Sequence, residues 1–169
     1  HATASYGQGI AMSPIETIRA LSVIANGGML IKPHIVNSIE YIDGRTENLL
    51  DGESLRVIES DTATDVTKML VSVVDNSISK AHPDIKMEHY TIAAKTGTAQ
   101  IADHVNGGYY SDRYLHSFFG YFPAYDPKFI VFIYQVYPKG AQYASETLVD
   151  PFTEITKFLI SYYDIPPDR

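Results

Sequence analysis

The 169-residue chain contains no cysteine, and this absence excludes a disulfide framework and a thiolate metal site. It also lacks any apolar run close to the roughly 20 residues that a membrane-spanning helix requires. The longest such run, residues 129–134, has the length of a strand. Basic residues are the minority: 13 Lys and Arg oppose 20 Asp and Glu, for a net charge of -7 and no basic cluster. Nucleic acid is therefore disfavoured as a partner, because binding to phosphates needs a local excess of Lys and Arg.

The histidines also lack the spacing of metal ligands, so we expect no metal site and no cofactor. They are His1, His34, His82, His89, His104 and His116. His116 begins a strand candidate, and we expect it to make a structural hydrogen bond there.

Hydrophobic residues make up 45% of the chain and charged residues 20%, which is ordinary for a globular protein with one core. The chain opens with the polar segment His1–Ser5 instead of a signal peptide or a methionine. We expect it to be a processed or cut segment, with any membrane anchor of the parent protein upstream.

Apolar residues at helical spacing predict three helices. Ser13 is a good N-cap, and Glu16 three residues later completes a capping box. The predicted helices run from Ser13 to the glycines at 27–28, from about Thr62 to Ile78, and from about Thr147 to Tyr163.

Three strands are predicted between the second and third helices, at residues 90–101, 116–122 and 128–137, with residues 102–113 as a loop. Their short connections favour antiparallel pairing. A further strand is expected at 35–42, followed by a hairpin signal at Asp43-Gly44. The fold class is thus α+β, with helices flanking an antiparallel sheet. Three strands are few for such a layout, so we expect an unpaired sheet edge and a partner strand outside this chain.

The sharpest chemical signal is Lys95-Thr96-Gly97-Thr98, which lies in the first of the three strands. Gly97 would let a ligand backbone approach the strand, and the threonine hydroxyls could hold a carboxylate beside the Lys95 ammonium. This pattern favours an extended anionic peptide that pairs along the strand. Strand alternation would put Lys95 and Thr96 on opposite faces. The motif alone is also compatible with an ordinary solvated edge strand.

Several short segments surround this motif in a fixed order. They are Tyr6-Gly-Gln-Gly9, Ser13-Pro-Ile-Glu-Thr17, Ile24-Ala-Asn-Gly-Gly28, His116-Ser-Phe-Phe-Gly120 and Ala144-Ser-Glu-Thr147. Together with the Lys-Thr-Gly-Thr strand, the set resembles the C-terminal part of a class B penicillin-binding protein along nearly the whole chain. Tyr6 and the closing segment 164–168 lean towards the division type. The resemblance implies the penicillin-binding transpeptidase and serine β-lactamase-like fold, with residues 1–169 as the C-terminal part of a single transpeptidase domain.

In that family a serine acyl-enzyme forms on a Ser-x-x-Lys motif, beside a Ser-x-Asn motif and the Lys-Thr-Gly strand. The resemblance implies that Lys95 sets the proton balance of the site and that Thr96 and Thr98 bind the carboxylate of a stem peptide or a β-lactam. It also implies that the Thr98 backbone N–H is an oxyanion donor, a contribution of about 3 kcal/mol. Gln100 would lie near the substrate. The tyrosines are expected to be core and rim residues, and the alternative for Tyr109-Tyr110, beside the motif strand, is that they flank the substrate groove.

The nucleophile is the large departure from the family pattern. The only Ser-x-x-Lys spelling, Ser77-Ile-Ser-Lys80, closes a predicted helix instead of opening one, and no Ser-x-Asn stands in a suitable place. We therefore expect the chain to be inactive alone and to need the remainder of the transpeptidase domain.

The partners expected of the parent protein are the peptidoglycan stem peptide, β-lactam antibiotics and members of a cell-wall synthesis complex. They would be met at the extracytoplasmic face of the bacterial membrane. The alternative is a non-catalytic sensor or scaffold module that binds wall peptide or division partners.

Overall fold

A computed structural model describes residues 3–49 and 54–169, so His1 lies outside the described residues. The helices are α1 (Pro14–Ala25), α2 (Ser60–Asn76) and α3 (Ser145–Tyr162). The main sheet contains β5 (Ala93–Ala102), β6 (Tyr109–Phe122) and β7 (Phe129–Val136). The short strands are β1 (Met29–Leu30), β2 (Ser38–Glu40), β3 (Thr46–Asn48) and β4 (Leu55–Arg56). Single 3-10 turns occupy Thr3–Tyr6, Ile78–Lys80 and Pro83–Ile85.

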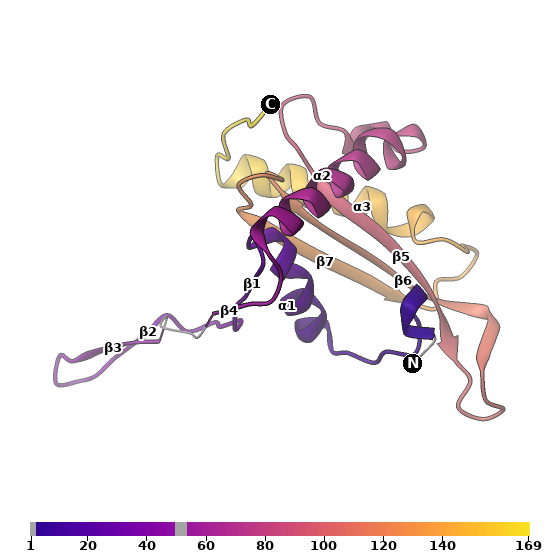
Figure 1. The fold of residues 1–169 in the computed structure, drawn as a ribbon, viewed down its shortest axis with the longest axis horizontal. Helices are drawn as coiled ribbons and strands as arrows, with labels where there is room; N and C mark the ends of the chain where they lie inside the picture. The colour runs from indigo at the N-terminus through magenta and orange to yellow at the C-terminus, as the bar shows by residue number, and fades with distance from the viewer. Residues whose placement is uncertain (1–2, 50–53) are drawn as a thin grey trace.

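Helices cover both faces of the main sheet (Figure 1), which confirms the predicted α+β class. The strands are antiparallel in the order β5-β6-β7, so among the described residues β5 and β7 each leave one edge unpaired. Alternation along β6 sends Phe118 and Phe122 towards α3, and Phe119 and Tyr121 towards α1 and α2. The two apolar sets form two core layers, one on each face of the sheet.

The approach of α3 to the sheet depends on a glycine in β6. The Phe152 ring of α3 packs on Phe118, with ring centroids 4.5 Å apart. A Cβ at Gly120 would lie 2.5 Å from the Phe152 ring. Gly120 therefore gives α3 the room to pack closely on β6.

A buried polar contact ties α2 to the opposite face. The Thr67 hydroxyl donates to the Ala63 carbonyl at 2.9 Å, so the Tyr121 hydroxyl, 2.7 Å away, is the donor in the contact between the two side chains. Burial raises the pKa of Tyr121. The contact satisfies a phenol that would otherwise be buried without a partner.

The predicted capping box begins α1. The Ser13 hydroxyl accepts from the Glu16 amide at 3.3 Å, and the Glu16 carboxylate accepts from the Ser13 amide at 2.8 Å. The Ser13 hydroxyl also donates to the Glu16 carboxylate at 2.7 Å, and the hydrogen bonds that this carboxylate accepts from the Ser13 hydroxyl and amide lower the pKa of Glu16. Gly28 follows the helix with a φ of +95°, and a Cβ there would lie 2.1 Å from the Ile58 carbonyl oxygen. The glycine turn thus lets β1 pair with β4, an interaction that the sequence did not predict.

Two predicted boundaries were wrong. The strand expected at 35–42 is only β2, although the Asp43-Gly44 turn does join it to β3, and this hairpin projects from the body of the molecule (Figure 1). Half of the loop expected at 102–113 is strand, because β5 extends to Ala102 and β6 begins at Tyr109, well before His116. The reason is a compact turn in which the Asp103 carboxylate accepts from the amides of Val105 and Asn106.

The helices α2 and α3 each begin two residues earlier than expected, at Ser60 and Ser145. Glu59 and Ala144, which precede them, make no side-chain cap, so the sequence held no strong start signal. Across residues 3–49 and 54–169, no helix has the length and apolar character to cross a membrane.

Candidate functional site

The Lys95–Thr98 motif lies on β5, which we call the motif strand, and the strand passes from the buried core to the surface at Lys95. Ala93 and Ala94 are buried between the helical layers, whereas Lys95 and Thr98 are exposed and Thr96 and Gly97 are half-buried. The buried half of β5 anchors the strand, and the exposed half presents the motif on an edge strand of the sheet. The motif is thus available to a ligand, as an edge-pairing site requires.

The Lys95 side chain turns back along its own strand. Its Nζ donates to the backbone carbonyl oxygen of Thr96 at 2.8 Å. The Lys95 side chain leaves the strand on the face opposite to the Thr96 side chain, and it then bends towards the backbone of the next residue. The flexible four-carbon stem of a lysine makes this reversal inexpensive. The bond holds the ammonium beside the backbone of Thr96.

The backbone of Thr98 offers an amide hydrogen near that ammonium. In an antiparallel strand, both polar groups of one residue point to the same side, and the next residue but one repeats that direction. The Thr98 N–H therefore points to the same side of β5 as the Thr96 carbonyl that carries Lys95. A cation and an amide donor on one side of a strand suit an oxygen atom that gains negative charge.

The Thr98 hydroxyl is oriented by α3. Its Oγ1 accepts a hydrogen bond from the Ala144 amide at 3.0 Å, at the start of the helix. Because the oxygen accepts from the protein, the hydroxyl proton is left to donate to a ligand. The arrangement can present Thr98 as a donor to a carboxylate.

Gly97 serves packing inside the protein. A Cβ at this position would lie 2.5 Å from the Ser117 Oγ of β6, and that hydroxyl is 3.4 Å from the Gly97 carbonyl oxygen. The sequence argument assigned the missing side chain to a ligand, but in the structure the neighbouring strand fills this space. Ser117 was not singled out from the sequence, where a serine in a strand carries no distinguishing signal.

His116 holds the loop before α3 against the sheet. It is fully buried, its Nε2 donates to the Gln142 carbonyl at 3.1 Å, and its Nδ1 lies 2.8 Å from the Thr147 hydroxyl. This confirms the expected structural hydrogen bond. His116 thereby fixes residues 142–147, which include the Ala144 amide that orients Thr98.

The remaining predicted residues lie at the far end of the motif. The Gln100 amide nitrogen donates to the Tyr110 carbonyl at 3.2 Å, so Gln100 is tied to β6 on the face that Thr98 shares. Tyr109 and Tyr110 begin β6 and do not lie in a loop. The guanidinium of Arg113 lies 3.9 Å from the Tyr110 ring centre.

The Ser77–Lys80 segment has no place in this site. Ser77 is the C-cap of α2, and Ser79 donates to the Asp75 carbonyl at 2.9 Å, as expected for a helix end. Metal chemistry also lacks a site in the described ranges, which contain no group of three or more His, Cys, Asp and Glu side chains suited to an ion.

Comparison with known proteins identifies the family to which this chain belongs. The family model "Penicillin binding protein transpeptidase domain" matches residues 1–156. The chain belongs to this family. The class B resemblance of its sequence is supported by two relatives. One is the penicillin-binding protein PbpB of Mycolicibacterium smegmatis, 32% identical over 95% of this chain and 26% of that protein. The other is the stage V sporulation protein D of Bacillus subtilis, 32% identical over 89% of this chain and 23% of that protein.

Solved structures share the fold of this penicillin-binding transpeptidase chain. Penicillin-binding protein 3 of Mycobacterium tuberculosis superposes with a TM-score of 0.83 and 27% identity over 96% of this chain and 38% of that one. The same protein has been solved with ampicillin, with a TM-score of 0.82 and 26% identity over 96% of this chain and 37% of that one. The chain thus spans about a quarter of the curated relatives it matches.

Proposed function

We propose that residues 1–169 form the C-terminal part of a peptidoglycan D,D-transpeptidase domain, which cross-links stem peptides through a serine acyl-enzyme and binds β-lactams. The serine belongs to a part of the domain outside this chain, because the family's Ser-x-x-Lys motif has no suitable match here. The chain's contribution is the strand that binds the carboxylate and polarises the scissile carbonyl.

The observation that carries this proposal is the set of donors on β5. The Lys95 ammonium, the Thr98 amide and the Thr98 hydroxyl all lie on the exposed half of one edge strand. In the proposed reaction, Thr96 and Thr98 hold the terminal carboxylate, and Gly97 keeps β5 close to β6. The Thr98 N–H then donates to the carbonyl oxygen as the serine attacks it.

The charge on Lys95 supports two steps. It attracts the anionic peptide terminus, and it favours loss of the serine proton by stabilising negative charge nearby. Gln100 lies farther along the strand, where the backbone of a bound peptide would continue. The nucleophile in that scheme comes from outside this chain, since the sequence offers no suitable match to the family's serine motif.

Relatives support the substrate and the cellular setting of the proposal. Two of them, from Nephroselmis olivacea and Mesostigma viride, are named peptidoglycan D,D-transpeptidase FtsI homologues. The Mycobacterium tuberculosis protein was also solved with aztreonam. We propose that this chain works at the extracytoplasmic face of a bacterial membrane, as part of a division-type enzyme in a cell-wall synthesis complex.

Covalent labelling with a fluorescent penicillin tests the proposal. The full-length protein that carries this chain should give a labelled band that survives denaturation, and the isolated 169-residue chain should give none. A labelled isolated chain would place the nucleophile within these residues. An unlabelled full-length protein would instead favour the non-catalytic sensor or scaffold module.

A further inference from the structure

The helix α3, together with the tail that follows it (residues 164–169), contacts the motif strand at two places. At the start of the helix, the Ala144 amide donates to the Thr98 hydroxyl. In the tail, the Asp168 carboxylate accepts from the Thr91 amide at 2.7 Å and from the Thr91 hydroxyl. Thr91 stands just before β5, and Thr98 lies in the exposed half of that strand. The motif is thus flanked by two threonines that α3 and its tail bind.

The length of α3 matches this pair of contacts. The helix has 18 residues, which at 1.5 Å per residue give a length of about 27 Å. The extended segment from Thr91 to Thr98 spans about 23 Å. A single rigid element is therefore long enough to reach both ends of the segment that carries the motif.

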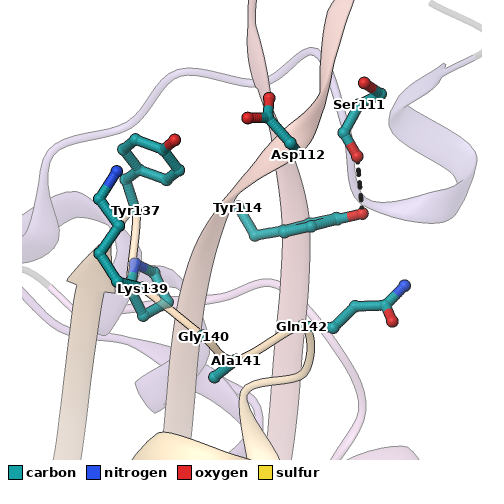
Figure 2. A pocket seen from close by; sticks show the side chains of 9 residues that line it. Ser111, Asp112, Tyr114, Tyr137, Lys139, Gly140, Ala141 and Gln142 are labelled. Carbon is teal, nitrogen blue, oxygen red and sulfur yellow. Dashed lines mark hydrogen bonds between the residues drawn. The ribbon is translucent and has the colours of Figure 1, made fainter.

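The start of α3 is fixed to the sheet through the loop before it. The Tyr137 amide donates to the Tyr114 carbonyl at 2.8 Å, and residues 137–142 run beside Tyr114 (Figure 2). His116 of β6 binds the same loop. The Ala144 amide is therefore held in place relative to the sheet when it contacts the motif strand.

A sharp turn at the end of α3 directs the tail towards the start of β5 (Figure 1). Asp164 has a φ of +48°, and the Ile165 amide donates to the Ile160 carbonyl at 3.1 Å, which is the pattern of a Schellman helix end. Ile165 is buried in the core, and its carbonyl accepts from the Tyr90 hydroxyl at 2.9 Å. The tail is therefore packed against the segment that leads into the motif strand.

An ion pair holds the last residue of the tail. The Arg169 guanidinium donates to the two Asp75 carboxylate oxygens at 2.8 and 3.3 Å, and the two side chains are only 26% and 20% exposed. A pair of this two-pronged kind is stronger than a single contact. Arg169 also donates to the Met87 carbonyl at 2.6 Å. The tail thus joins the end of α2 to the segment before β5.

Thr91 connects this tail to the sheet. It is 6% exposed, and its hydroxyl and carbonyl oxygens each accept from the Ala124 amide at 3.0 Å. Because the hydroxyl oxygen accepts from Ala124, the hydroxyl proton is donated to Asp168. Ala124 follows β6 closely, so Thr91 is bound by the neighbouring strand and by the tail together.

The motif strand depends on such support because it lies at an edge. Within residues 3–49 and 54–169, β5 is hydrogen-bonded to β6 on one side only. That pairing sets the register of the two strands, but the end of a strand with few contacts opens more easily than a strand enclosed on both sides. Displacement of a catalytic group by about 1 Å can reduce a rate about 100-fold.

We propose that Asp168 is a positioning residue for acyl transfer, which acts through Thr91 to hold the start of β5. The inference rests on the proposed function of the Lys95–Thr98 motif. In this arrangement α3 and its tail hold the motif strand at both ends, and the amide and hydroxyl of Thr98 stay where the substrate carbonyl and carboxylate would lie. Loss of the Asp168 contacts loosens the start of the strand and misplaces these donors.

The acylation kinetics of the full-length protein test this role. Time-resolved labelling at saturating fluorescent penicillin gives a rate constant and, separately, an amplitude that reports the folded fraction. Asp168→Ala should lower the rate constant about tenfold. A purely structural role would lower the amplitude and leave the rate constant of the folded molecules unchanged. Asp168→Asn, which keeps an acceptor for the Thr91 amide, should recover most of the rate.

A second substitution tests the connection through Thr91, and a third provides the control. Thr91→Val removes the hydroxyl that donates to Asp168, so the double variant with Asp168→Ala should be little slower than Asp168→Ala alone. The control is Asp84→Ala, which removes an exposed carboxylate that pairs with Lys157 of α3 at 3.1 Å. It should leave the rate constant unchanged.

An unchanged rate constant in Asp168→Ala, or rate losses that simply add in the double variant, would overturn the inference. In either case normal labelling of the wild-type protein would leave the proposed transpeptidase function standing. A wild-type protein that the penicillin does not label would overturn both proposals together.

Discussion

The Ala144 amide donates a hydrogen bond to the Thr98 hydroxyl at 3.0 Å and so joins the start of α3 to the motif strand. The two residues are far apart in sequence, and the contact determines which way the hydroxyl proton can point. The start of α3 thereby orients the Thr98 hydroxyl, on an edge strand of the sheet, so that its proton can be donated to a ligand.

Replacing Thr98 tests this donor. Thr98→Val in the full-length protein removes the hydroxyl but keeps the shape and the backbone amide. Acylation by a penicillin should slow about 10- to 100-fold, because a hydrogen bond to a charged group contributes about 1.5–3 kcal/mol. Stopped-flow or time-resolved labelling measures the rate. Thr98→Ser, which restores the hydroxyl, should recover most of it; equal rates for the two variants would contradict the assigned role.

Gly97 and Ser117 should show coupled stability. Gly97→Ala places a Cβ 2.5 Å from the Ser117 Oγ and should lower the free energy of unfolding by about 1–3 kcal/mol. Adding Ser117→Ala removes that oxygen, and the next atom of Ser117 is 3.9 Å from the new Cβ. Denaturant unfolding of the four proteins in a double-mutant cycle should therefore reveal a coupling. Additive losses would mean that the serine hydroxyl is not the obstacle.

His116 should matter for stability more than an exposed histidine does. His116→Leu leaves the Gln142 carbonyl and the Thr147 hydroxyl without their partner beside a buried site, which should cost about 1–3 kcal/mol. His34, which is exposed, provides the control, since His34→Leu should change little. Urea unfolding measures both. Similar losses for the two variants would show that the buried hydrogen bonds are unimportant.

The Asp103 turn should be sensitive to acid. Hydrogen bonds from Asn106, first from its side chain and then from its backbone, lower the pKa of Asp103 from 3.8 to about 2. Because the folded pKa lies below the unfolded one, the stabilisation is complete above pH 3.8 and is lost as the pH falls towards 2. NMR titration of the Asp103 carboxyl carbon measures this value. Asn106→Ala should raise it, whereas Val105→Ala, which keeps the backbone amide, should not.

The sequence predicted those structural features that are formed by residues close together in the chain. The capping box of Ser13 and Glu16 predicted the start of α1, because both of its hydrogen bonds join residues three positions apart. The Asp43-Gly44 turn was predicted for the same reason. The extent of β6 was missed, because the glycines at 107 and 108 suggested a long loop. The structure closes that segment into a short turn around Asp103.

For the site, the sequence by itself determined which residues we propose to carry the chemistry, namely the Lys95–Thr98 motif in its order among the flanking segments, and showed that the family's serine motif has no suitable match. Only the tertiary structure decided how those residues are held. The Lys95 ammonium bends onto the Thr96 carbonyl, Ser117 fills the space that Gly97 leaves, and Ala144 turns the Thr98 hydroxyl outward. These contacts join positions whose separation along the chain has no fixed spacing. They arise from the packing of α3 and β6 against β5, which no local sequence pattern encodes.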